Sequence, residues 1–342
     1  MGKYLIDLLD KKQVPTYVTS RKKHKDFGTI HYVQGNAKEM PFLTQICSQE
    51  KWDAIVDFMS YKTDEFKQRY ELLLSSTLQY IFISTARVYG NEEHPIKETS
   101  PRLLDCSTDK EFLSTDEYSL TKARQENILY NSGKTNYTII RPCIIYGDNR
   151  LQLGVLEKEE WLYRALHGRQ IVFCQEILDK VTTMTNGFDI ARAFSEIIGN
   201  KKSLGETIHL TCTHHRTWRQ IFDIYSNTLR DLTGRVPNMK IVPLSEFINS
   251  RPDYLKYQVI YDRVYDKDFC VEKESEFIDV DSFLPPEVGL RKCLTNFLEN
   301  GCPFNYVTVK YEAKRDKLTK EYSTFADVRG IKEKMKYLYY RF

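Results

Sequence analysis

Hydrophobic and polar positions in the first 150 residues alternate between two periods. Short runs rich in β-branched and aromatic residues predict strands, and segments with apolar residues three or four apart predict helices. The predicted strands cover residues 16–20, 29–33, 53–58, 80–84 and 137–141, and the predicted helices cover 3–12, 38–48, 64–75 and 118–131, with a polar loop over 91–117. This alternation predicts βαβ units, and therefore an α/β fold with a doubly wound, Rossmann-type parallel sheet.

The pattern loosens after Gly147. Helices are predicted over residues 157–166, 188–198 and 218–229, and a strand over 207–211. We predict a dinucleotide-binding domain over residues 1–150, completed by about 180–212, and a smaller α+β substrate-binding domain over 151–180 and 213–300. Residues 301–342 are then a basic, aromatic C-terminal extension.

Charge is unevenly distributed along the chain. Residues 306–342 hold ten Lys or Arg and five Asp or Glu, a local charge of +5, whereas the whole chain carries +3. Tyr306, Val307 and Val309 alternate like a strand, and residues 331–340 predict a helix. The extension therefore packs on the body or between copies, with a homodimer left open, or it binds RNA or an anionic surface. The even overall balance does not by itself indicate a nucleic-acid partner.

Composition bounds the class and the compartment. With 41% hydrophobic and 28% charged residues the chain is an ordinary globular protein. It has no apolar window of about 18 residues and no secretory pattern at its start, so neither a membrane partner nor export is expected. The eight cysteines form no CxxC pair, which indicates thiols in a reducing cytoplasm. The doublet His214–His215 lacks nearby Cys or spaced carboxylates, so no metal site is expected.

Three segments carry candidate chemistry. Residues 84–90 read STARVYG at the end of a predicted strand, residues 118–122 read YSLTK at the start of a predicted helix, and residues 141–147 read RPCIIYG at the end of the next strand. In a parallel sheet these ends meet at one edge, which is where ligands bind in such folds.

The spacing of Tyr118 and Lys122 has a physical meaning. Positions i and i+4 lie on one helix face, and an ammonium beside a phenol favours phenolate and lowers the tyrosine pKa. Such a tyrosine takes a proton from a hydroxyl as it is oxidised, or gives one to a carbonyl as it is reduced. The hydroxyl of Thr85 is placed to hydrogen-bond the same substrate oxygen.

Together these motifs resemble those of the extended short-chain dehydrogenases/reductases, the NAD-dependent epimerase/dehydratase group that acts mainly on nucleotide sugars. The resemblance covers about residues 2–230. It implies a catalytic triad of Thr85, Tyr118 and Lys122, with Lys122 also touching the nicotinamide ribose. It further implies cofactor contacts for Asn36, beside the adenine, and for the loop Phe58, Met59 and Ser60. Ser84, Arg87, Arg150 and Trp161 are added as candidate substrate contacts.

The start of the chain departs from that family. Gly2 aligns with the third glycine of the family's G-x-x-G-x-x-G turn, and the preceding strand and two glycines are missing. That turn lets the backbone approach the pyrophosphate at a helix N-terminus. The missing strand would be central in the sheet, so its loss leaves neighbouring backbone groups unpaired. Either the start is assigned too late within a longer reading frame, which we favour, or the chain is a remnant that binds cofactor poorly.

Two further departures bear on cofactor and reaction. The second strand of the family pattern ends Thr19-Ser20-Arg21, without the acidic residue that holds ribose hydroxyls in NAD enzymes. Arg21 suits a 2′-phosphate, so the cofactor is NAD or NADP, with NADP favoured. The dehydratases carry Asp-Glu where this chain has Ala86 and Arg87, which argues against a 4,6-dehydratase.

The sequence therefore supports an NAD(P)-dependent epimerase or reductase acting on a nucleotide sugar, with the tyrosine as acid and base. The alternative is a non-catalytic, cofactor-sensing or binding member of the same fold, which the lost glycine turn and the basic extension favour.

Overall fold

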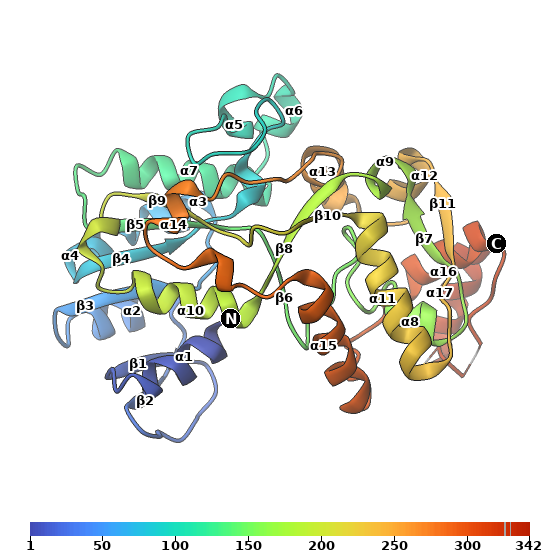
Figure 1. The fold of residues 1–342 in the computed structure, drawn as a ribbon, viewed down its shortest axis with the longest axis horizontal. Helices are drawn as coiled ribbons and strands as arrows, with labels where there is room; N and C mark the ends of the chain where they lie inside the picture. The colour runs from blue at the N-terminus through green and yellow to red at the C-terminus, as the bar shows by residue number, and fades with distance from the viewer. Residues whose placement is uncertain (325, 329) are drawn as a thin grey trace. The chain divides into compact units, whose positions relative to one another are not determined.

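The computed structural model describes residues 1–324, 326–328 and 330–342, and its chain divides into two units. Unit 1 comprises Met1–Ile145, Met184–Thr213 and Phe269–Leu284, and unit 2 comprises Tyr146–Thr183, His214–Asp268 and Pro285–Phe342. Each unit is therefore assembled from separate stretches of the chain (Figure 1). None of the described helices is long and apolar enough to cross a membrane.

Unit 1 is built on parallel strands. Its strands are β1 (Thr16–Ser20), β2 (Ile30–Gln34), β3 (Trp52–Asp57), β4 (Thr77–Ile83), β5 (Tyr137–Pro142) and β9 (Thr207–Leu210). Its helices are α1 (Gly2–Lys11), α2 (Met40–Cys47), α3 (Thr63–Lys67), α4 (Tyr70–Ser75), α5 (Leu103–Cys106), α6 (Lys110–Leu113), α7 (Tyr118–Tyr130), α10 (Gly187–Ile197) and α14 (Glu272–Ser275). Strands and helices alternate as the hydrophobic pattern predicts, so the Rossmann-type α/β fold is confirmed.

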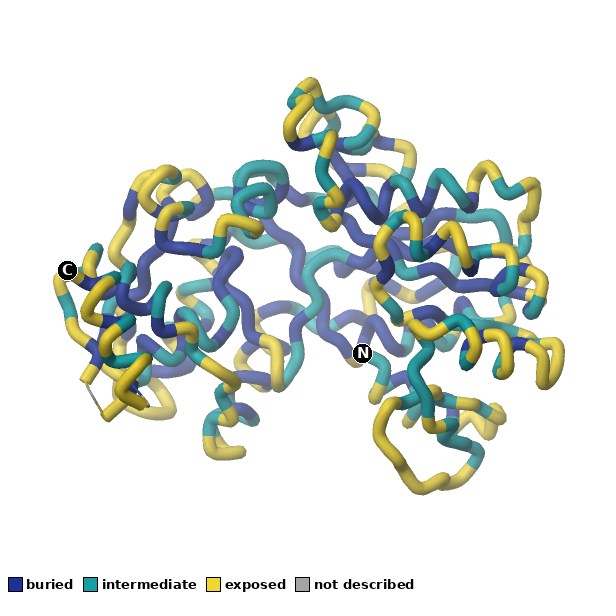
Figure 2. The backbone as a smooth tube through the Cα atoms, turned by 180° about the vertical axis from the view of Figure 1, so that it is seen from behind, coloured by how far each residue is buried: buried dark blue, intermediate teal, exposed yellow. Residues whose placement is uncertain are grey.

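Helices cover both faces of the sheet. Successive residues of β4 point to opposite sides, because side chains alternate along a strand. Tyr80 and Phe82 enter an apolar cluster with α2, α3, α4 and α7, whereas Ile81 enters a second cluster with α1 and α10. Strands β4, β5 and β9 are mostly buried, whereas β1 and β3 consist mainly of partly buried and exposed residues (Figure 2).

The parallel strands of unit 1 fall into two sheets. One has the order β1-β2 and the other has the order β3-β4-β5-β9. Within the described residues, β1 and β3 thus each have one edge without a strand partner, although Tyr17 and Trp52 bring their rings within 5.1 Å across the break. The break falls where the sequence pattern lacks its expected strand.

Unit 2 is a mixed α+β assembly. Its strands β7 (Ile171–Cys174) and β11 (Met239–Val242) pair in parallel, and β10 (His215–Thr217) pairs antiparallel with Val181–Thr183 of β8 (Val181–Asn186). Its helices are α8 (Leu162–Leu166), α9 (Gln175–Leu178), α11 (Trp218–Thr233), α12 (Leu244–Asn249), α13 (Lys256–Gln258), α15 (Pro286–Glu299), α16 (Val309–Thr319) and α17 (Ile331–Arg341). Strands β6 (Ile144–Tyr146) and β8 run across the division between the units.

Three predicted elements are wrong. The helix over residues 64–75 is two helices, since Arg69 leaves the helical conformation with φ −129° and lays its guanidinium 4.2 Å from the Tyr61 ring. The helix over 157–166 begins only at Leu162, because the preceding turn places Glu160 against two buried arginines. The alternation at 306–309 is not a strand: α16 begins at Val309, and the pattern was too short to establish a period.

The predicted loop over residues 91–117 also contains the two short helices α5 and α6. The helix predicted over 331–340 is confirmed as α17.

Candidate active site

The candidate residues of the STARVYG and YSLTK segments meet at the carboxyl edge of the unit 1 sheet. Strand β4 ends at Ile83 and delivers Ser84 and Thr85, while α7 begins at Tyr118. Thr85 caps the short 3₁₀ turn Ala86–Val88, where its Oγ1 accepts a hydrogen bond from the Arg87 backbone N–H at 3.2 Å. A hydroxyl that accepts in this way keeps its own O–H to donate.

Glu117 organises the start of α7. One of its carboxylate oxygens accepts a hydrogen bond from the Ser119 backbone N–H at 2.6 Å, which satisfies a donor at the helix N-terminus. The other oxygen binds Arg87 at 2.5 Å. The guanidinium of Arg87 in turn lies 5.3 Å from the ring centroid of Tyr118, which is 40% exposed. Glu117 therefore holds a cation against the face of the tyrosine.

Lys122 lies one turn further along α7 and is almost wholly buried. Its ammonium is 4.5 Å from the ring centroid of Phe82. Burial lowers the pKa of Lys122 to about 8, although the carboxylates of Asp57 and Glu126 oppose that shift. A lysine in this range changes charge near neutral pH, which is the behaviour expected of a group that takes part in proton transfer.

Asp57 closes β3 directly beside Phe82, its register partner in β4. Its carboxylate accepts hydrogen bonds from the Tyr80 hydroxyl at 2.9 Å, the Tyr61 hydroxyl at 3.4 Å and the Met59 backbone N–H at 2.9 Å. Burial raises the pKa of Asp57, and its hydrogen bonds and the Lys122 charge oppose the rise. The described structure pairs this carboxylate with no arginine, so Lys122 is the cation that faces it.

Glu126 is the second carboxylate near Lys122, and arginines surround it. Arg141 binds it through two nitrogens at 2.8 and 2.7 Å, and Arg102 binds it at 3.0 Å. Burial would raise the pKa of Glu126, but the charge and hydrogen bonds of Arg141 lower it. Ser84 donates its hydroxyl to the same carboxylate at 2.6 Å. Ser84 is thus a buried structural group, and its prediction as a substrate contact is wrong.

Other candidate cofactor residues lie at the carboxyl ends of β1, β2 and β3. Arg21 is exposed after β1, and Phe58 and Ser60 are exposed after β3, with Met59 partly buried between them. Asn36 follows β2, but its amide already donates to Glu39 at 3.0 Å. Gly2 begins α1, and a Cβ added there would meet open space.

Arg150 and Trp161 belong to unit 2. Arg150 is exposed and lies 3.9 Å from the Glu157 carboxylate. Trp161 is wholly buried, donates its indole N–H to the Leu151 carbonyl at 2.9 Å and packs on Tyr225 with ring centroids 4.5 Å apart. A side chain so enclosed offers no surface to a ligand, so the prediction for Trp161 is wrong.

Asp57 and Glu117 were not among the site residues predicted from the sequence. A carboxylate that ends the apolar run DAIVDF is a detectable signal, because a buried acid is costly unless it is paired. Glu117 lies in the tetrapeptide STDE, directly before Tyr118. Its role becomes visible only when the fold brings Arg87 next to it.

Comparisons with known proteins identify similar folds. An NAD-binding family model described as male sterility protein matches residues 69–185. The enzyme WbmH of Bordetella bronchiseptica, solved with NAD+, is similar over 88% of this chain and 95% of its own at a TM-score of 0.63 and 15% identity. The UDP-glucose 4-epimerase of Bifidobacterium longum, solved with NAD+ and UDP, is similar over 88% of this chain and 96% of its own. Its TM-score is 0.63 and its sequence identity is 16%.

The chain has the extended short-chain dehydrogenase/reductase fold. The residues that the NAD-binding family model matches include strands β4 and β5 of unit 1. Among curated proteins, the chloroplast stem-loop binding protein of 41 kDa b from Arabidopsis thaliana is 28% identical over 203 residues, which are 58% of this chain and 48% of that protein. The chain thus spans about half the length of this relative.

The described residues fit a nicotinamide cofactor at one end of its site. Thr85, Tyr118 and the buried Lys122 stand where this fold directs its ligands, at the carboxyl edge of the strands. At the other end, α1 begins at Gly2, the residue that aligns with the third glycine of the family's turn.

Proposed function

We propose that this protein is an NAD(P)-dependent oxidoreductase or epimerase acting on a hydroxyl of a nucleotide sugar. The observation that carries the proposal is Lys122, a buried lysine with a pKa of about 8 one helical turn from Tyr118. A purely structural lysine gains nothing from burial at this position, because burial penalises its charge. Structural neighbours solved with UDP or a UDP sugar support the substrate class.

The reaction is a proton transfer coupled to a hydride transfer. A bound nicotinamide cofactor would supply the hydride acceptor for oxidation of the substrate carbon and the hydride donor for its reduction. Tyr118 as phenolate accepts the proton of the hydroxyl, so the alcohol becomes a ketone and the tyrosine becomes a phenol. The Lys122 ammonium stabilises the phenolate before the transfer. In an epimerase the ketone turns over and Tyr118 gives the proton back, whereas a reductase begins from the ketone.

Thr85 and Arg87 orient the reacting oxygen and the tyrosine. The O–H of Thr85 is available to donate to the substrate oxygen, since its Oγ1 is held by the Arg87 backbone. Arg87 stands over the Tyr118 ring where the dehydratases of the family carry an acid, so elimination of water is not part of the proposal. Arg21, exposed after β1, supports NADP, because an arginine can form bidentate hydrogen bonds with a 2′-phosphate.

Turnover by a Tyr118→Phe variant tests the proposal. We expect NAD(P)-linked oxidation or epimerisation of UDP sugars by the full chain, and a loss of at least about 100-fold in kcat in the variant. Tyr130→Phe is the matched control, because Tyr130 is on the same helix and is 41% exposed. Full activity in the Tyr118 variant, with the control also active, contradicts the role.

A second candidate function is non-catalytic binding of structured RNA. The observation that favours it is the name of the Arabidopsis relative, a stem-loop binding protein. Titration with NAD(P)H, followed by nicotinamide fluorescence, and gel shift with a stem-loop RNA separate the candidates. RNA binding without cofactor binding supports the second and contradicts the first.

A further inference from the structure

The C-terminal lobe, residues 306–342, presents one helix in a fixed orientation. On the inner side of α17, the Tyr337 hydroxyl donates to Asp316 of α16 at 2.6 Å. Arg341 donates to the Glu321 carbonyl at 3.1 Å and stacks 4.5 Å from the Tyr322 ring. Tyr337 also joins a small apolar cluster with residues of α16. These contacts determine which face of α17 points outward.

The outward face of α17 is apolar. Its members, which we call the α17 crest, are Ile331, Met335, Leu338, Tyr339 and Phe342, and they are between 41% and 80% exposed. At about 100° per residue, positions 331, 335 and 338 fall on one narrow stripe, with Tyr339 at its border, and Phe342 follows directly after the end of the helix. The same geometry places Lys332 on one side of the stripe and Lys334 on the other. The crest is thus an exposed apolar ridge between lysines.

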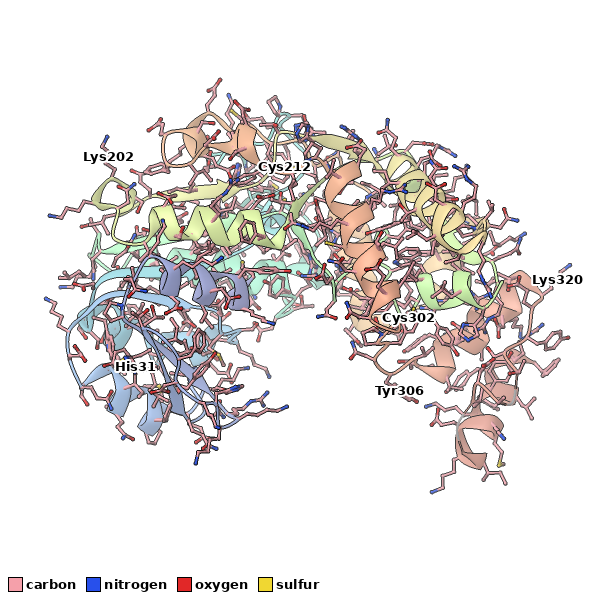
Figure 3. The ribbon with its side chains drawn as sticks, turned by 60° about the horizontal axis from the view of Figure 1, so that its bottom comes forward. His31, Lys202, Cys212, Cys302, Tyr306 and Lys320 are labelled. Carbon is pink, nitrogen blue, oxygen red and sulfur yellow. The ribbon has the colours of Figure 1, made fainter. Side chains whose placement is uncertain are left out.

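The surface of the C-terminal lobe is basic. Two of its five acids, Glu312 and Asp316, are buried against Arg164, at 2.6 and 2.7 Å, so their charge does not reach the surface. Its seven lysines, by contrast, all remain at least partly exposed: Lys310, Lys314, Lys317, Lys320, Lys332, Lys334 and Lys336. Figure 3 shows Lys320 reaching away from the lobe and Tyr306 on the same lobe.

We propose that the α17 crest is a docking surface for an anionic lipid bilayer, on which the helix lies in the plane of the headgroups. An amphipathic helix with large apolar side chains between lysines is the pattern of interfacial binding. Tyrosine at the border of the crest suits the headgroup level, and lysines extend from it toward anionic headgroups. The proposal does not depend on the proposed enzymatic function.

Charge and side-chain chemistry favour lipid over the other occupants. In a pairing of two crests, lysines of both copies would face one another, which opposes association. Among the described residues of the lobe, both arginines are buried, whereas arginine is the preferred residue for bidentate contacts with nucleic acid. Three of the five crest side chains, Ile331, Met335 and Leu338, are aliphatic or thioether, and such side chains do not provide the stacking platforms that single-stranded bases use.

Co-sedimentation of the full chain with vesicles tests the proposal. Vesicles of phosphatidylcholine mixed with phosphatidylglycerol are compared with vesicles of phosphatidylcholine alone. We expect binding to the anionic vesicles that weakens with salt, and a loss of at least about 10-fold in the double variant Met335→Glu, Leu338→Glu. Lys332→Glu with Lys334→Glu should reduce partitioning at least about 25-fold, at about fivefold for each lysine lost.

Val236→Glu is the matched control, because Val236 is 65% exposed in unit 2 and lies outside the lobe. It should bind as the parent protein does, and thermal melting of each variant verifies that it is folded. The proposal is overturned if the parent protein does not bind anionic vesicles, or if the crest variants bind as well as the control. Self-association that the crest variants abolish would assign the crest to a second copy instead. A gel shift of single-stranded RNA without vesicle binding would assign it to nucleic acid.

Discussion

Replacing Asp57 with Asn should lower the pKa of Lys122. The charge of Asp57 opposes the lowering of this pKa by burial more strongly than the charge of Glu126 does. Glu126 is already balanced by Arg141 and Arg102. An opposite charge within a few ångströms shifts a pKa by about 1–3 units, or about 1.4–4 kcal/mol. At pH 7, about nine-tenths of Lys122 is charged in the parent protein, and about half or less should be charged in the variant.

The substitution is mild in shape. An asparagine oxygen still accepts from the Tyr80 hydroxyl and the Met59 N–H, so the end of β3 should keep its geometry. Asp53→Asn is the control, because Asp53 lies on the same strand but is exposed.

Titration of lysine labelled with ¹³C at Cε reports the charge directly by NMR, with the Lys122 signal assigned from Lys122→Arg. Because Lys122 stabilises the phenolate, the acid limb of the pH–rate profile should also move to higher pH. The reasoning fails if the Lys122 titration in Asp57→Asn coincides with that of the parent protein or of Asp53→Asn.

Three further outcomes follow from buried charges. Arg164→Met should cost about 3–5 kcal/mol in urea unfolding, because it leaves buried carboxylates such as Asp316 without one of their cations; a loss below about 1 kcal/mol contradicts this. Glu274→Gln should raise the melting temperature at pH 8 but not at pH 4. Burial raises the pKa of Glu274 well above 4.5, so the parent protein loses stability as pH rises through the folded pKa. Equal gains in melting temperature at pH 8 and pH 4 would contradict this prediction. Glu117→Gln should weaken the ion pair that holds Arg87 over the Tyr118 ring, and should lower kcat more than it changes KM. A change in KM alone would instead indicate a role in substrate binding.

The sequence predicts the layers of unit 1 well because its strands and helices have different hydrophobic periods. It predicts the position of Tyr118 and Lys122 because an i, i+4 spacing survives any arrangement of the rest of the fold. It fails at the helix over residues 64–75, where the side chain of Arg69 is drawn into a tertiary contact with Tyr61. No local pattern announces such a contact.

Burial was the other quantity that the sequence could not supply. Ser84 belongs to the STARVYG motif and Trp161 follows the RPCIIYG motif in sequence, but both are enclosed by the fold. Asp57 shows the opposite error: its place in an apolar run signals a buried acid, but only the fold shows that the charge of Lys122 acts on it. Structural and reactive groups are thus distinguished by the charges that distant segments bring next to them, and only the three-dimensional structure shows these pairings.

The interleaved course of the chain has a consequence for its synthesis. The apolar cluster that holds α1 and α10 against the sheet also contains Ile278, Val280 and Phe283. On the ribosome, the Rossmann-type unit therefore cannot complete its core until about residue 284 has emerged, when most of unit 2 has already been made. We expect the first 145 residues to remain partly folded and accessible to chaperones until the later segments of unit 1 are synthesised. We also expect the whole protein to fold slowly, because the contacts that complete unit 1 join segments far apart in sequence.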